Sequence, residues 1–556
     1  MSSAVRKHPG GNASGEQGVV FDVLIAGAGP AGLTMANLLG QAGVRVLLIE
    51  RDPGLSEIPK ALLIDDEFFR LLATLGLSAP VSAHGVYPIS FDYYSPMGWR
   101  VGHVEPSITE HHYSRRTATF QPEFEAILLA GGERFPTFEA RFRHELVDFE
   151  QDADGVVATL ATPEGEARVR ARYLIGADGS HSLVRKKLGI PFDEVRKFGD
   201  RHIVVDVLED PDTSPVAVTK LGWSRNYVSL PSPNGGRRYE VSLHEHETDD
   251  AALLEDAALA RMLAPICDDI RTRRVIRKAI YTFHSRIARR LSAGRVHLVG
   301  DAAHVMPIFG SQGMNSGARD VKNLGWKLAE VVHGRALPSL LDSYHEERFE
   351  HLVETIKIAT ANGKLQSARM LPVTMARDLF LGAASLIPAF SRWIRDMRYI
   401  PKPYLKSGIV LHDGRPDPKS LVGRVLPNPA VVSDGGAEML LDDLLGPGFA
   451  LVGLDVAEAP AGALRHPFLD PARISRVALR PEGAPAPRAA EGVVTAALAD
   501  HRLSEAIAFH AGKWLLVRPD RIVAAALAPA DLAAGAGHLS RLLAGEASPE
   551  PASVAA

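Results

Sequence analysis

A glycine-rich turn near the start of the chain and an aspartate-containing turn far downstream constrain the fold more than any other feature. The first lies in FDVLIAGAGPAGLTMANLLG and the second in VHLVGDAAHVMPIFGSQGMNSGARD. Each follows an apolar run that is typical of a buried parallel strand and precedes apolar residues at helical spacing. Two such strand-turn-helix units, so far apart, predict an α/β domain whose parts are separated in sequence by insertions.

The first turn carries the pattern GxGxxG in Gly27, Gly29 and Gly32. Gly27 permits a tight turn, Gly29 lets the backbone approach a pyrophosphate, and Gly32 lets the helix pack closely on the strand. The helix that begins at Pro30 and Ala31 then directs its positive N-terminal end toward the phosphates. The turn therefore predicts a dinucleotide site, and a glycine turn in some other α/β unit is the alternative.

A second apolar strand, residues 44–49, brings Glu50 to the same site. A carboxylate about 20 residues beyond the glycine turn accepts hydrogen bonds from an adenosine ribose. Arg51 follows it and has two possible roles, because a basic residue here either assists the diphosphate or meets a 2′-phosphate. The turn alone does not decide which dinucleotide binds.

Two further motifs indicate the cofactor by resemblance. GADGSHSLVR and GDAAHVMPIFGSQGMNSGARD, together with GAGPAG, resemble the three fingerprints of the class A flavoprotein monooxygenases, the aromatic hydroxylases of the p-hydroxybenzoate hydroxylase fold. Arg115-Arg116 with Gln121-Pro122, the run Ile64 to Glu67 and the C-terminal VRPDR extend the resemblance over roughly residues 20 to 540. Within that class the chain is most similar to the 3-(3-hydroxyphenyl)propionate and phenol hydroxylases.

The resemblance implies an enzyme of aromatic compound catabolism that binds FAD and uses NAD(P)H as co-substrate. Reduced flavin would add O2 to give a flavin hydroperoxide, which hydroxylates a phenolic ring. The helix after GDAAH is expected to begin near Asn315. Its positive end would then lie near the flavin pyrimidine edge, where negative charge develops on reduction.

The residues that the resemblance assigns to the cofactor come from all three fingerprints and the segments between them. They are Gly27, Gly29, Pro30, Ala31, Gly32, Glu50, Arg51, Lys60, Arg116, Gln121, Leu146, Asp178, Asp301, Gly313, Met314 and Asn315. Asp178 is expected to serve both FAD and NAD(P)H, and Asp301 the ribityl hydroxyls. Lys60 stands where many relatives carry Arg, which leaves a cation without a bidentate geometry.

No catalytic base is evident in the sequence. Pro307 is expected near the flavin, where a backbone carbonyl can face the phenol. Tyr227, His244 and His246 lie in the predicted substrate sheet and are candidates for phenol deprotonation. A plain surface role is the alternative for these histidines.

The pattern along the chain predicts a Rossmann-like FAD-binding domain, an interleaved substrate domain built on an antiparallel sheet, and a C-terminal thioredoxin-like domain that has no cysteine. The predicted sections are a mobile tail at 1–20, the interleaved domains at 21–405, the thioredoxin-like domain at 406–540 and a tail at 541–556. Within 21–405 the substrate sheet is expected mainly at 90–114 and 198–290, with helices at 339–402. The C-terminal domain is expected to form contacts between copies or to close over the main domain, and a structural appendage is the alternative.

The composition is that of a large enzyme without nucleic-acid or metal chemistry. Net charge is −4, so no basic surface for nucleic acid is implied. Cys267 is the only cysteine, which excludes cysteine metal clusters and CxxC chemistry within one chain, and no metal site is expected. The N-terminal segment lacks the apolar core of a signal peptide and no apolar run reaches a membrane span, so a cytoplasmic location without stable membrane insertion is expected.

Two other functions share these motifs. An FAD-dependent oxidase or dehydrogenase of the same fold would use the same cofactor residues without transferring oxygen to a substrate. A non-catalytic NAD-binding or interaction module would purify colourless, whereas bound FAD colours a protein yellow. The identity of the phenol, the choice between NADH and NADPH, and the oligomeric state do not follow from the sequence.

Overall fold

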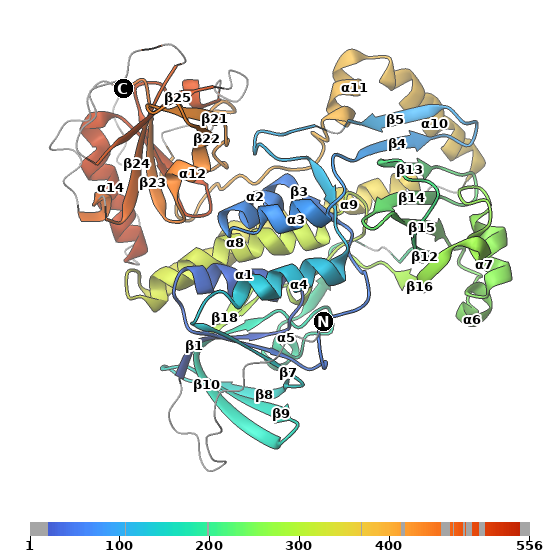
Figure 1. Cartoon of the computed structure of the whole chain (residues 1–556), viewed down its shortest axis with the longest axis horizontal. Helices are drawn as coiled ribbons and strands as arrows, with labels where there is room; N and C mark the ends of the chain where they lie inside the picture. Colours follow the sequence, from blue (N-terminus) through green and yellow to red (C-terminus); the bar gives the residue numbers. More distant parts are fainter. Residues whose placement is uncertain are drawn as a thin grey trace.

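The computed structural model describes residues 20–105, 107–196, 199–367, 370–412, 417–456, 467–470, 472–481, 484, 492–499 and 506–544. The predicted N-terminal tail, apart from residue 20, and residues 545–556 lie outside these ranges. Three bodies are visible in Figure 1: a mixed sheet with helices above it, a second sheet to the right, and a C-terminal domain at the upper left.

The first sheet has eight strands and carries the glycine turn. Its main path runs β18-β19-β10-β1-β2-β7, and β9 and β8 extend it from β10. The strands are β1 (Val20–Ala26), β2 (Val46–Glu50), β7 (Phe138–Phe142), β8 (Glu145–Gln151), β9 (Val156–Thr162), β10 (Gly165–Gly176), β18 (Ser292–Ala293) and β19 (Val296–Leu298). The central strands β2, β1, β10 and β19 pair in parallel, so their carboxyl ends meet at one edge of the sheet.

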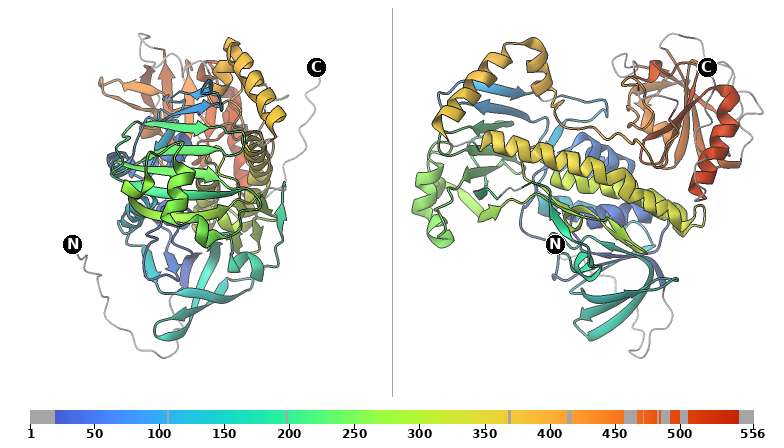
Figure 2. Two further views of the ribbon diagram at one scale, coloured as in Figure 1. Left: turned by 90° about the vertical axis from the view of Figure 1, so that its right-hand side faces the viewer. Right: turned by 180° about the vertical axis from the view of Figure 1, so that it is seen from behind.

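Helices cover the first sheet and contribute the rest of the FAD-binding body. These are α1 (Pro30–Gln41), α2 (Asp66–Thr74), α3 (Ser78–His84), α4 (Gln121–Gly132), α5 (Leu183–Lys187), α8 (Gly313–Val332) and α9 (Asp342–Gln366). Close approach of α8 to α1 depends on Gly325, where an added Cβ would lie 2.6 Å from a Leu38 methyl carbon. The long helix α9 lies beside α8 and runs from the C-terminal domain toward the second sheet (Figure 2).

The second sheet has seven strands in the order β16-β12-β15-β14-β13-β4-β5, and all of them lie within the segments 90–114 and 198–290 predicted for the substrate sheet. All pairs are antiparallel except β13 with β4. Its strands are β4 (Ser90–Tyr94), β5 (Arg100–Val104), β12 (Arg201–Leu208), β13 (Val216–Lys220), β14 (Tyr227–Ser232), β15 (Gly236–Ser242) and β16 (Arg274–Thr282). One face packs against α7 (Asp256–Leu263) around a core that includes Cys267, and α6 (Asp250–Leu253) lies next to α7. Helices α10 (Leu371–Ser385) and α11 (Pro388–Arg395) cover β5.

Two small sheets connect these bodies. One pairs β3 (Leu63–Asp65) with β6 (Arg116–Ala118), and the other contains β11 (Phe192–Glu194), β17 (Arg286–Ala288) and β20 (His304–Val305).

The C-terminal domain is built on a third sheet, with the order β22-β21-β25-β24-β23-β26-β27. Its elements are β21 (Ala430–Ser433), β22 (Glu438–Leu440), α12 (Leu441–Leu445), β23 (Phe449–Leu454), β24 (Ile474–Arg480), β25 (Val494–Leu498), β26 (Trp514–Val517), β27 (Val523–Leu527) and α14 (Leu532–Leu543). These elements lie within the segment 406–540 predicted for the C-terminal domain, except that α14 continues to Leu543, into the segment predicted as a tail.

The turn VRPDR between β26 and β27 joins the C-terminal domain to the helices of the FAD-binding body. Arg518 donates two hydrogen bonds to the Glu347 carboxylate of α9, at 2.7 and 2.8 Å, and Lys327 of α8 donates to the same carboxylate at 2.7 Å. All three side chains are fully buried. Asp520 pairs with the same guanidinium at 2.6 Å. This buried network fixes the two bodies against each other.

No single helix among the described residues is long and apolar enough to cross a membrane, although α10 and α11 pass that test together as a pair bent by 105°. Within the same described ranges, no cluster of three or more His, Cys, Asp or Glu side chains could hold a metal ion.

Candidate functional site

The glycine turn lies at the carboxyl edge of the first sheet, and its three glycines have different surroundings. Gly27 has φ +111°, and a Cβ there would lie 2.4 Å from the carbonyl oxygen of Ala177. A Cβ on Gly32 would lie 2.0 Å from the oxygen of Gly27. A Cβ on Gly29 would meet no atom within 4 Å. Gly27 and Gly32 therefore allow the turn to close, whereas Gly29 borders open space at the N-terminus of α1, as a pyrophosphate site requires.

Glu50 ends β2 beside this turn. Its Oε2 accepts a hydrogen bond from the backbone N–H of Ala28 at 2.8 Å, and its Oε1 accepts one from the N–H of Asp52 at 3.1 Å. Each carboxylate oxygen keeps a further lone pair for a ribose hydroxyl. Arg51 is exposed next to it, and Leu146 is buried on β8. The adenosine end of the predicted site is thus an oriented carboxylate near an apolar wall.

Asp301 follows β19 at the same edge of the sheet. It is exposed between buried Gly300 and Ala302, and no hydrogen bond or ion pair joins its carboxylate to the residues that the structure describes. Desolvation by the surrounding protein raises the pKa of the Asp301 carboxyl, and the charges of His304 and Lys60 oppose that shift. Asp301 and Lys60, from different segments, are therefore close enough to interact along the predicted cofactor path from Gly29 past Asp301 to Gly310, which is called the groove below.

The turn that carries Asp301 is held from behind by Asp320 of α8, a residue that sequence reasoning missed. Its Oδ2 accepts from the backbone N–H of Gly300 at 3.1 Å and lies 2.6 Å from Nε2 of His304, and its Oδ1 accepts from Nε of Arg348 at 3.0 Å. Burial alone would raise the pKa of Asp320, but His304 and Arg348 lower it. The sequence signal that could have identified Asp320 was a carboxylate next to an apolar position, Val321, of the predicted helix.

The segment before α8 borders the predicted position of the flavin ring. Gly310 and Ser311 have φ of +87° and +53°, and the Arg116 guanidinium donates to the carbonyl oxygen of Gly310 at 3.2 Å. Helix α8 begins at Gly313, two residues before the predicted start. The first N–H groups of a helix have no carbonyl partner within it, so those of Gly313 and Met314 are available to a ring at this position.

Three predicted cofactor residues have side chains that are already engaged by protein. Asn315 is fully buried and bonds the backbone of Leu63, Asp65 and Ser311. Asp178 accepts from the Ser182 hydroxyl and from the backbone N–H of Val184, so it caps α5. Gln121 accepts from the backbone N–H of Ala61 at 2.6 Å and thereby positions the segment of Lys60. These hydrogen bonds hold the three side chains in place, and the partly buried Asp178 carboxylate keeps one lone pair on each oxygen.

The candidate bases of the second sheet do not come together at the groove. Tyr227 pairs with Val241, on the face that packs against α7. Glu240, one residue along, lies on the opposite face with His202 and Val204. The rings of His244 and His246 stack at 5.4 Å in the loop after β15, where His246 is exposed. Strand alternation, which the sequence could have supplied, therefore directs Tyr227 away from the groove.

A different set of polar side chains surrounds a small cavity beside Gly310. This cavity is bordered by Phe309 and Gly310, by Asn362 of α9 and by Tyr399.

Two tyrosines near this cavity have raised pKa values. Burial raises the pKa of Tyr93, which lies on the face of the second sheet opposite to α7 and is close enough to Tyr399 and Arg116 for their charges to affect it. Burial also raises the pKa of Tyr399, which Arg116, a hydrogen bond from Asn362 and Arg115 oppose. Tyr399 therefore lines this cavity, and Tyr93 and Arg116 are close enough to Tyr399 to interact with it. The buried Pro307 lies just ahead of Phe309 in the same segment.

Comparison with known proteins agrees with this arrangement. The family described as FAD binding domain matches residues 20–358, and that described as HcaD C-terminal domain matches residues 423–542. The chain is 39% identical over 433 residues to a 3-(3-hydroxy-phenyl)propionate/3-hydroxycinnamic acid hydroxylase of Mycobacterium sp. (strain JLS), which covers 78% of this chain and 75% of the relative. It is 35% identical to the hydroxylase of that name from Klebsiella pneumoniae (strain 342), over 92% of this chain and 93% of the relative. The structure of aklavinone-11 hydroxylase with FAD and aklavinone superimposes with a TM-score of 0.76 at 25% identity, over 95% and 99% of the two chains.

Proposed function

The chain belongs to the FAD binding domain family of flavoprotein monooxygenases, and from this premise we propose that it hydroxylates a phenol that carries a carboxylate side chain, with NAD(P)H and O2 as co-substrates. The observation that carries the proposal is the placement of three features: the open space beside Gly29, the exposed carboxylate of Asp301 and the small cavity beside Tyr399. A dinucleotide that spans the first two would bring its ring toward the cavity.

FAD, when bound, would accept electrons from NAD(P)H and would transfer one oxygen atom of O2 to the ring of the substrate. The N–H groups at the start of α1 would bind its pyrophosphate, Glu50 the ribose and Asp301 the ribityl chain. The positive end of α8 would face the flavin pyrimidine edge and stabilise negative charge there. The choice between NADH and NADPH stays open.

The cavity provides groups for the phenol itself. We propose that Tyr93 and Tyr399 orient the phenol oxygen and that the Arg116 guanidinium stabilises its deprotonated form, because opposite charge favours an ionised oxygen. A phenolate directs hydroxylation to the carbon next to it, so the expected product is a catechol. The aromatic walls exclude water from this step.

Arg115 is our candidate for the substrate carboxylate. Arg115 precedes Arg116 and is half-buried. It is close enough to Tyr399 for its charge to lower the pKa of the tyrosine hydroxyl. The curated relatives are named for 3-(3-hydroxy-phenyl)propionate, whose carboxylate needs such a cation. A bidentate pair of this kind is within the chemistry of arginine.

Arg115→Met is expected to weaken binding of 3-(3-hydroxyphenyl)propionate while sparing a phenol that has no carboxylate. Loss of one charge-assisted contact, about 1.5–3 kcal/mol, should raise KM for the acid roughly tenfold or more. The measurement is steady-state product formation with the acid and with 3-ethylphenol, on the wild type, Arg115→Met and the exposed control Arg274→Met. Equal losses for both substrates in Arg115→Met would show that Arg115 does not bind the carboxylate.

Asp301→Ala is expected to lower the FAD affinity without unfolding the protein, since its carboxylate has no partner among the described residues to lose. The removed hydrogen bonds should cost roughly 1–3 kcal/mol of binding free energy. FAD titration of the deflavinated protein, followed by the absorbance near about 450 nm, measures this. An unchanged dissociation constant would exclude Asp301 from the ribityl site.

We further propose that the C-terminal domain is thioredoxin-like in architecture. The order β24-β23-β26-β27, with one parallel pair followed by two antiparallel pairs and then α14, supports this. The domain has no cysteine, because the single cysteine of the chain is Cys267, so a thiol redox role is chemically excluded. Contact between copies through this domain stays a prediction.

A further inference from the structure

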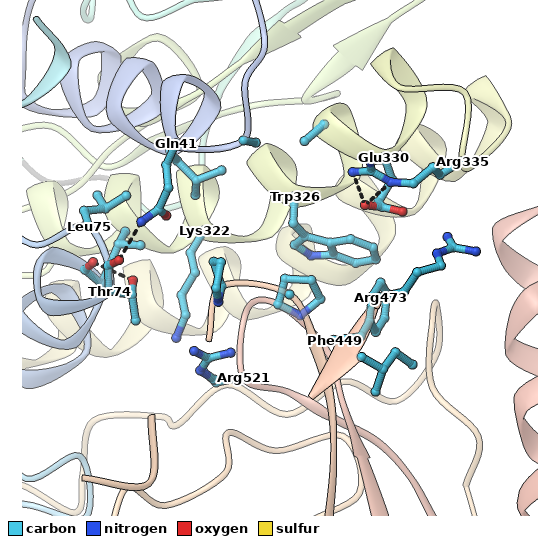
Figure 3. A pocket seen from close by; sticks show the side chains of 18 of the residues that line it. Gln41, Thr74, Leu75, Lys322, Trp326, Glu330, Arg335, Phe449, Arg473 and Arg521 are labelled. Atoms are coloured by element: carbon cyan, nitrogen blue, oxygen red, sulfur yellow. Dashed lines mark hydrogen bonds and ion pairs between the residues drawn. The ribbon is translucent and has the colours of Figure 1, made fainter. Parts of the chain in front are cut away.

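A second cavity lies between the FAD-binding body and the C-terminal domain. Its volume is about 320 Å³, and it is bounded by α1, α2 and α8 on one side and by segments around Phe449, Phe468 and Arg521 on the other (Figure 3). The α1 residues that border it, Leu38, Gln41 and Ala42, are at the end of the helix opposite to Gly29. At 1.5 Å per residue this is roughly 15 Å from the pyrophosphate site. The cavity is therefore separate from the groove.

One end of this cavity carries more positive than negative charge. Arg70, Lys322 and Arg521 meet there, and Figure 3 shows the Lys322 side chain extending toward the Arg521 guanidinium. Asp442 pairs with Arg70 at 2.6 Å and with Arg521 at 2.8 Å. The other carboxylates that act on Lys322 are already paired, Glu67 with Arg319 and Asp520 with Arg518.

Two of these cations lack a complete set of partners. Arg521 is 1% exposed, and its NH1 is buried without a hydrogen-bond partner among the described residues. Within that same part of the chain, no hydrogen bond or ion pair engages the Lys322 ammonium. Burial and the charge of Arg70 lower the pKa of Lys322 to about 8. Buried charges are normally paired, so this cluster can accommodate a further anion.

The rest of the cavity is apolar and aromatic. Trp326 and Phe449 meet edge to face at 5.4 Å, and Phe449 meets Phe468 in the same way at 5.2 Å. Leu71 and Ala329 complete this wall. Ligand pockets typically combine such a wall with a few polar groups that fix orientation, and a volume of about 300 Å³ is enough for a small organic molecule.

We propose that this cavity binds an organic carboxylate with a ring-sized apolar body, whose carboxylate lies between Lys322 and Arg521 and whose body contacts Trp326 and Phe449. A ligand here touches both bodies of the protein, so it strengthens their contact. The inference does not depend on the reaction at the groove.

The test uses the FAD-loaded full chain and three probes: 3-phenylpropionate, which lacks the ring hydroxyl, hexylamine and inorganic phosphate. Scanning calorimetry measures the rise in Tm that each causes. We expect a concentration-dependent rise with 3-phenylpropionate that is reduced in Lys322→Met and retained in Lys357→Met, an exposed lysine on α9. Binding of this probe at the substrate cavity is common to all three proteins, so the difference between them reports on the second cavity. Hexylamine should cause none. Without any probe, Lys322→Met should have an unchanged or higher Tm, because one of three clustered cations is removed.

Ala329→Phe narrows the apolar end without altering the cations, and it should reduce the effect of 3-phenylpropionate but not that of phosphate. Three results would overturn the proposal. The first is an equal rise in Tm for Lys322→Met and the wild type. The second is an equal rise with phosphate and 3-phenylpropionate, which would indicate a site for a simple inorganic anion. The third is a lower Tm of Lys322→Met without probe, which would indicate a structural lysine.

Discussion

Gly29→Val is expected to fold normally and to purify almost without FAD. The backbone at Gly29 has φ −74° and ψ 177°, which any residue adopts, and an added Cβ meets no protein atom within 4 Å. The valine side chain would instead occupy the space of the pyrophosphate. Losing two hydrogen bonds to that charged group costs roughly 3–6 kcal/mol, a hundredfold or greater loss of affinity. Flavin absorbance per chain after purification measures the result, and circular dichroism checks the fold.

The matched control for this variant is Gly382→Val on α10, where a Cβ also meets nothing within 4 Å. It should retain full flavin. Gly32→Val is a contrasting variant, because its Cβ would overlap the Gly27 oxygen, and it should lose stability together with flavin. A yellow Gly29→Val protein with normal flavin content would place the pyrophosphate elsewhere.

Glu347→Ala is expected to destabilise the protein by about 3–5 kcal/mol, the cost of leaving buried charges without their partner. Glu347 accepts from both Arg518 and Lys327 in a fully buried network that joins two bodies. Denaturant unfolding followed by both tryptophan fluorescence and flavin release measures the loss. Glu350→Ala, one turn along α9, removes an exposed pair with Lys406 and should change stability by less than about 1 kcal/mol.

The effect of Glu347 has a defined pH dependence. Burial alone would raise its pKa, but Arg518 and Lys327 hold it well below its usual range. A lowered pKa in the folded state stabilises the protein above the ordinary pKa of glutamate, about 4.3, and that contribution is lost as the pH falls through the folded pKa. The difference between wild type and Glu347→Ala should therefore be complete at pH 7 and decrease below about pH 4. Equal stability of the two proteins at pH 7 would contradict this role.

Local patterns in the sequence were enough to predict the nucleotide-binding unit. The order strand, glycine turn, helix, strand and acid fixed the positions of Gly29 and Glu50, because each step depends on neighbouring residues. The helix of the third fingerprint was predicted to within two residues of its start at Gly313. The strands of the second sheet lie within the segments predicted for it from the same kind of local signal.

Side-chain direction and long-range partners could not be obtained in this way. Asn315 and Asp178 carry family motifs, yet they bond to segments of the protein itself, and only the assembled fold shows it. Tyr227 is an exception, because strand alternation alone places it on the opposite face of the sheet from Glu240. Arg518 and Glu347 are 171 residues apart, and no local pattern announces such a pair. Tyr93 and Tyr399, near the small cavity beside Gly310, likewise come from segments that are far apart in the sequence.

Oxygen incorporation tests the proposed hydroxylation most directly. The FAD-loaded protein is supplied with 3-(3-hydroxyphenyl)propionate, NADH or NADPH, and ¹⁸O2, and mass spectrometry determines the label in the aromatic product. The account predicts one ¹⁸O atom in a newly formed catechol, with close to one product per reduced nicotinamide consumed and the second oxygen atom released as water. The contradicting result is consumption of NAD(P)H that yields hydrogen peroxide while the phenol stays unlabelled and unchanged, with carboxylated and uncharged phenols alike. That result would identify an oxidase of the same fold.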